Sequence, residues 1–220
     1  MDPDGVRASP RPLLDVRGWE AFMHGVFAIA VTLLILDIRV PDVATIDSGA
    51  ALVEALAAQL PRYAAYVLGF VFLGEYWLAT NRTVGMVRGV NHSFLILGLV
   101  FLMVIAAVPF ATALLAEYIG YGNGRDQVAV VVFVSWQLGL AILANIMIRY
   151  AAYGGRLLKP TVSEPGLRRW LRVVALGPLI WFVALLTTLF VSSKVTLVLM
   201  AVLAVVFMFD VPIEVGAEDV

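Results

Sequence analysis

Four side chains in the first apolar segment recur at the spacing that places them on one face of a helix. They are Ile29, Thr32, Leu33 and Leu36. If several copies of this face surrounded an axis, Ile29 would form a dry collar that controls the passage of an ion, and Thr32 would offer a hydroxyl to a partly dehydrated cation. An apolar stripe is more often a packing face. The spacing alone therefore leaves both interpretations open.

The composition places this segment in a membrane. Of the 220 residues, 62% are hydrophobic and 14% are charged, and the mean hydropathy is +0.95. About a quarter of the residues of a soluble domain are charged. As a helix, residues 19–38 would extend about 30 Å, the thickness of a hydrocarbon core. We predict an all-α membrane protein, and the net charge of −1 gives no indication of nucleic-acid binding.

The chain carries no signature of an enzyme. It lacks the motifs of zinc hydrolases, of serine nucleophiles and of phosphate-binding loops. It has no cysteine and two histidines, His24 and His92, so a metal centre is not expected. We therefore predict a protein that is not an enzyme and needs no cofactor.

Charge, proline and glycine divide the chain into six apolar segments. These are approximately 19–38, 61–79, 93–116, 128–148, 173–191 and 195–210. They predict one six-helix transmembrane domain over 19–213, between an N-terminal segment, 1–18, and a short acidic tail, 214–220. Ser48 is placed to cap a short helix over 49–60. With both termini in the cytoplasm, eleven Lys and Arg lie inside and four outside, which favours this orientation.

The first span resembles the opening helix of a known family. Arg17, Phe22 and the string Gly-Val-Phe-Ala-Ile-Ala-x-Thr-Leu-Leu-x-Leu-Asp-Ile, residues 25–38, are similar to prokaryotic members of the transmembrane protein 175 family, the endosomal and lysosomal potassium channels. A looser similarity continues through residues 75–77, 81–82 and 109–118. Beyond about residue 125 it consists of hydropathy and helix count.

The resemblance implies a homotetramer in which the first helix of each six-helix subunit lines a central potassium-permeable pore. By position, Ile29 corresponds to the family's hydrophobic constriction and Thr32 to its threonine layer. The implied partners are copies of the same chain, membrane lipids and potassium ions, in a prokaryotic plasma membrane. On this basis we predict a leak-type channel without a carbonyl filter. A single hydroxyl ring replaces little of a hydration shell, so the predicted preference for potassium over sodium is modest.

The chain departs from the family pattern in a cytoplasmic motif. Family members usually carry Ser-Asp after the phenylalanine, whereas Met23 and His24 follow Phe22 here. They usually carry a histidine shortly after the tryptophan of the second span, whereas Thr80 follows Trp77 here. The two halves of one polar network are thus altered together.

These departures suggest a replacement contact. His24 and Glu75 are expected at a similar depth, and a carboxylate inside a membrane needs a partner. We therefore predict a contact between His24 and Glu75, with Arg17 or Arg82 nearby. The alternative is that His24 extends to the cytoplasmic surface.

Residues 118–122, Tyr-Ile-Gly-Tyr-Gly, resemble the filter loop of ordinary potassium channels. Such a filter needs a pore helix of about ten residues between two complete spans. Taking that helix from residues 107–117 would leave the third span too short to cross a membrane. We therefore expect Gly120, Gly122 and Gly124 to form a turn between spans three and four.

Two other functions remain open. Glu75 and His24 are possible titrating groups of a proton-coupled or cation-coupled secondary transporter, and a non-conducting scaffold would use the first helix only for packing. A channel passes ions down their gradient without a co-substrate, so ion flux separates these functions. Gln137 and Asn145 are expected to bond neighbouring helices rather than to line a path.

Overall fold

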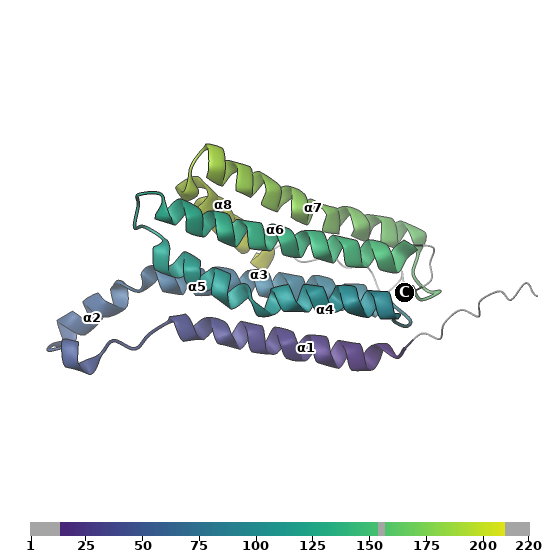
Figure 1. Ribbon diagram of the computed structural model, residues 1–220, viewed down its shortest axis with the longest axis horizontal. Coiled ribbons are helices and arrows are strands. Elements are labelled where there is room, and N and C mark those ends of the chain that lie inside the picture. The colour runs from purple at the N-terminus through teal and green to yellow at the C-terminus, as the bar shows by residue number, and fades with distance from the viewer. Residues whose placement is uncertain (1–13, 154–156, 210–220) are drawn as a thin grey trace, which may run out of the picture.

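The computed structural model describes residues 14–153 and 157–209, and this part of the chain is a helical bundle with isolated β-bridges (Figure 1). The predicted acidic tail, 214–220, and most of the predicted N-terminal segment lie outside the described residues. The helices are α1 (Val16–Leu33), η1 (Leu34–Asp37), η2 (Val43–Thr45), α2 (Gly49–Ala57), α3 (Leu60–Gly85), α4 (His92–Ala106), α5 (Val108–Tyr118), α6 (Arg125–Ala152), α7 (Glu164–Phe190) and α8 (Ser193–Phe209).

The long helices agree in position with the predicted apolar segments. Within the described residues, four stretches are long and apolar enough to cross a membrane, namely 16–37, 92–118, 125–152 and 164–190. α2 and α3 make a fifth if they are counted as one span with a 45° bend, and α8 is a shorter apolar helix. The predicted short helix over 49–60 ends earlier, at Ala57, and Ser48 caps it by accepting a hydrogen bond from the backbone N–H of Ala51.

The bundle has α1 at one edge. Figure 1 shows α1 along one side, α3 with α4 and α5 in the middle, and α6, α7 and α8 on the far side. Contacts agree with this order, because α1 packs on α3, α4 and α5, whereas α6 and α7 form the most extensive helix pair among the described residues. One side of α1 is therefore left uncovered in the single chain.

The structure confirms the prediction that three glycines form a turn, which joins α5 to α6. Gly120, Gly122 and Gly124 all have positive φ values, of 87°, 65° and 77°. Side chains with a Cβ rarely adopt this conformation, so it favours glycine at all three positions, and Asn123 between them also has a positive φ, of 52°. The segment resembling a filter loop is thus a tight turn that joins two helices.

A proline and an asparagine explain how α7 is held against α6. Pro178 lies inside α7 and lacks an N–H, so the carbonyl of Val174, four residues earlier, loses its helical donor. The Asn145 side chain of α6 donates to this same carbonyl at 2.6 Å. The expectation that Asn145 bonds a neighbouring helix is confirmed, and its partner is the carbonyl that Pro178 leaves without a donor.

Asn145 and Pro178 should therefore be energetically coupled. We expect Asn145→Leu to lower the free energy of unfolding by about 1–2 kcal/mol, because a carbonyl within the bundle is left without a donor. In the Pro178→Ala background the helix supplies its own N–H, and the same change should cost less than half as much. Unfolding of the four proteins of this double-mutant cycle in detergent measures the coupling. Equal costs in the two backgrounds would contradict it.

Candidate functional site

The first helix buries one face and exposes the opposite one. The buried side chains of α1 and η1 recur every three or four residues and are Trp19, Met23, Phe27, Ala30 and Leu34. The predicted stripe lies on the other side, where Ile29 is 62% exposed and Leu36 is 70% exposed, with Thr32 and Leu33 also exposed. The structure thus brings all four stripe residues together on the uncovered face of the edge helix.

The Thr32 hydroxyl is bonded to the backbone of its own helix. It donates a hydrogen bond to the backbone carbonyl of Ile29 at 2.9 Å. A hydroxyl has one hydrogen to donate and two lone pairs, so this bond leaves the oxygen able to accept or to coordinate. On this face, Thr32 therefore presents an oxygen beside the apolar side chain of Ile29.

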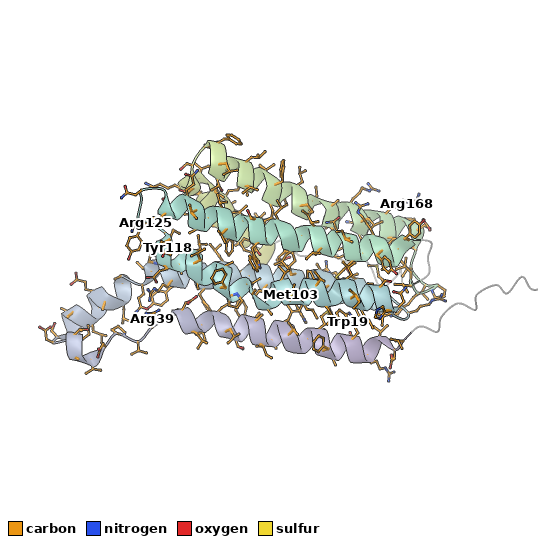
Figure 2. All side chains as sticks on the ribbon, viewed as in Figure 1. Trp19, Arg39, Met103, Tyr118, Arg125 and Arg168 are labelled. Carbon is orange, nitrogen blue, oxygen red and sulfur yellow. The ribbon has the colours of Figure 1, made fainter. Side chains whose placement is uncertain are left out.

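The buried face of α1 fits a groove on α4. Trp19 meets Phe94 edge to face, with ring centroids 6.4 Å apart, and Phe27 meets Phe101 at 6.3 Å. Between these two contacts, a Cβ added at Gly98 would overlap the Trp19 ring. Figure 2 shows Trp19 at this boundary between α1 and α4. The absence of a side chain at Gly98 is what lets α1 lie this close to α4.

His24 reaches α3, but not at the predicted partner. Its Nε2 lies 3.3 Å from Oδ1 of Asn81, and its ring packs on Trp77 with centroids 6.0 Å apart. Glu75 instead lines a cavity between α3, α6 and α7. The predicted His24–Glu75 contact is therefore wrong. Side chains two positions apart in a helix point in directions that differ by about 200° around the helix axis. Glu75 and Trp77 therefore point to nearly opposite sides of α3, although their depth in the membrane is similar.

The other residues of the predicted cytoplasmic motif do not form one network. Arg17 and Phe22 lie on the exposed side of α1, and Met23 is fully buried. The Thr80 hydroxyl donates to the carbonyl of Tyr76 in its own helix at 2.6 Å. Arg82 turns away from α1 and lies over the ring of Trp170, on α7, at 5.6 Å. Asn81 is the partner that sequence reasoning missed, and its position one turn after Trp77 was the available signal.

The chain just after η1 is also anchored. The side chain of Gln59 makes two hydrogen bonds to the backbone of Arg39, accepting from its N–H at 2.9 Å and donating to its carbonyl at 2.8 Å. Arg62 and Glu117 form an ion pair at 2.6 Å that joins α3 to α5, the two helices that flank η1. The first helix is therefore held on α3 at His24 and again just after η1, at Arg39, and its exposed stripe lies between these two anchors.

Comparisons with known proteins identify the family. The family model of the endosomal/lysosomal potassium channel TMEM175 matches residues 19–109, which contain most of α1, the His24–Asn81 and Gln59–Arg39 contacts, and Gly98 of α4. A potassium channel of Streptomyces collinus is 38% identical over 191 residues, which cover 87% of this chain and 90% of the relative. This chain belongs to the TMEM175 family. A potassium channel of Chamaesiphon minutus is 34% identical over 188 residues, which cover 86% of this chain and 91% of that protein.

The fold agrees with that of a TMEM175 homologue. The crystal structure of a lysosomal potassium-selective channel TMEM175 homologue from Chamaesiphon minutus matches with a TM-score of 0.77 and 30% sequence identity. The match covers 88% of this chain and 96% of the other. The likeness to the family therefore extends well beyond residue 125, where sequence reasoning ended it. These relatives are ion channels and not enzymes.

Proposed function

We propose that this chain is a subunit of a passive, potassium-permeable channel whose pore is lined by the exposed face of α1. The observation that carries the proposal is the uncovered stripe from Ile29 to Leu36, on an edge helix within the segment that matches the TMEM175 family. The named bacterial relatives are potassium channels. A helix that is anchored before and after such a stripe can hold it at a fixed distance from a pore axis.

The proposed assembly is a homotetramer of six-span subunits in a prokaryotic plasma membrane, with lipid around it. α8, with 17 residues, is the sixth span and extends about 25 Å. Figure 2 supports the orientation, because Arg39 and Arg125, assigned to the outside, lie at one end of the bundle and Arg168, assigned to the cytoplasm, lies at the other. Both termini are then cytoplasmic.

In this assembly the constriction acts by dewetting. Copies of Ile29 converge on the axis and exclude water when they are close, and Thr32 supplies a ring of hydroxyl oxygens one turn further along. Leu33 and Leu36 continue the apolar wall. No ring of carbonyls replaces the hydration shell of the ion, so potassium is favoured over sodium only modestly.

A coupled secondary transporter is the second candidate. It is favoured by Glu75, a partly buried carboxylate within a membrane helix. This function requires Glu75 to gain and lose a proton or a cation during transport. The channel proposal requires neither.

Ion flux in liposomes distinguishes the two functions. Purified protein is reconstituted in vesicles loaded with potassium, and efflux is followed with and without a proton or sodium gradient. A channel gives efflux that follows the potassium gradient alone and persists in Glu75→Gln. Efflux that saturates, requires the second gradient and is lost in Glu75→Gln would identify a carrier. Efflux no faster than that of empty vesicles would contradict both functions and favour the non-conducting scaffold.

A further inference from the structure

A cavity of about 230 Å³ lies between α3, α6 and α7, on the side of α3 opposite Trp77. Four of its lining residues are aromatic, namely Phe72, Tyr76, Trp170 and Trp181. Aliphatic side chains, most of them from α7, form most of the remaining wall, together with Ala141 and Ala144 of α6 and the backbone of Gly177. The cavity is therefore largely apolar, with aromatic surface on α3 and on α7.

One carboxylate lines this apolar cavity. Glu75 is partly buried, and among the described residues its side chain forms no hydrogen bond and no ion pair within 4.0 Å. Arg82 also lines the cavity, but its guanidinium lies over the ring of Trp170. The charge of Arg82 acts on Glu75 at longer range, but it offsets less than burial costs, and a carboxylate without a hydrogen bond or ion pair in a membrane segment is costly. A cation that enters the cavity would remove part of this cost.

We propose that this cavity binds a lipophilic monoamine, with its ammonium at the Glu75 carboxylate and its apolar body among the aromatic rings. Charge complementarity selects the head group, because a bound anion would lie beside Glu75. The aromatic rings add cation–π attraction to an alkylated ammonium. The volume is small, so it suits one ring or a short branched chain rather than a long acyl chain. The site is separate from the exposed face of α1.

Benzyltrimethylammonium is a suitable probe, since its charge does not depend on pH. The full chain is titrated in detergent, and binding is followed by calorimetry and by the fluorescence of Trp170 and Trp181, which line the cavity. We expect saturable binding at one site per chain. The neutral isostere neopentylbenzene should bind at least tenfold more weakly, because it has the shape of the probe without its charge.

Variants identify the groups that recognise the probe. Glu75→Gln should weaken binding at least tenfold, and the matched control Glu54→Gln, at an exposed position of α2, should leave it unchanged. Ala79→Phe keeps the carboxylate but fills the cavity, so it should also abolish binding. It serves as the test if Glu75→Gln does not fold.

Three results would overturn the proposal. The first is equal affinity for the cation and its neutral isostere, and the second is undiminished binding to Ala79→Phe or to folded Glu75→Gln. The third is stronger binding of benzenesulfonate than of the cation, which would identify Arg82 as the recognising group. The readout is binding, so a protein that conducts no potassium can still confirm the site.

Discussion

Replacing Ile29 with asparagine should raise potassium efflux from liposomes on the order of tenfold. Copies of Ile29 at a shared axis form an apolar collar, and an asparagine at this position lets water remain in the constriction. Lowering the barrier to ion passage by about 1.4 kcal/mol changes the rate tenfold. The measurement is the initial rate of efflux per reconstituted protein at a fixed potassium gradient.

Ile35 provides the matched control. It lies on the same segment and is 47% exposed, but by helical spacing it faces about 120° away from Ile29. Ile35→Asn makes the same chemical change and should leave efflux within about twofold of the original rate. If Ile29→Asn and Ile35→Asn raise efflux equally, leakage through a disturbed bundle explains both and the collar is wrong. Unchanged efflux in folded Ile29→Asn would also contradict it.

The second large effect is expected at Gly98. Because a Cβ at this position would overlap the ring of Trp19, Gly98→Ala should push α1 away from α4 and lower the free energy of unfolding by about 1–3 kcal/mol. Gly139, on α6, has open space where a Cβ would be placed. Gly139→Ala should therefore be neutral or stabilise the protein by up to about 1 kcal/mol, since alanine favours a helix.

Unfolding of the purified variants in detergent tests whether the free energy of unfolding falls in Gly98→Ala and stays equal or rises in Gly139→Ala. A compensating change makes the test specific: Trp19→Leu is costly alone, but in the Trp19→Leu background Gly98→Ala should cost little. Efflux should fall in Gly98→Ala and recover in part in the double variant, because α1 carries the stripe. Equal stabilities of Gly98→Ala and Gly139→Ala would show that the close contact of α1 with α4 contributes nothing.

The elements of the fold could be predicted because their signals are local. Apolar runs bounded by charge mark the long helices, and three glycines near Tyr118 mark the turn that proves to have positive φ values. The orientation of the stripe could also be predicted, since spacings of three and four residues place Ile29 and Leu36 on one face whatever that face contacts.

Contacts between helices could not be predicted in the same way. The predicted contact between His24 and Glu75 was based only on their similar depth in the membrane. The direction in which a side chain leaves the helix changes by about 100° per residue, and it decides the contact partner as strongly as depth does. Pro178 in a helix predicts that the carbonyl four residues earlier lacks its usual N–H donor. The sequence near Pro178 does not show that the side chain of Asn145 supplies this donor. Gly98 gives no sign of the tryptophan that covers it, because the two residues lie on different spans.

The most direct test of the central claim is the reaction of cysteines on α1 with a charged thiol reagent. The chain has no cysteine, so each variant carries a single reactive site. We expect a cationic methanethiosulfonate to block potassium efflux through Thr32→Cys and Leu36→Cys, whose side chains face the proposed axis. Ile35→Cys should continue to conduct. Uninhibited efflux through modified Thr32→Cys and Leu36→Cys, or equal block of Ile35→Cys, would contradict a pore lined by this face of the first helix.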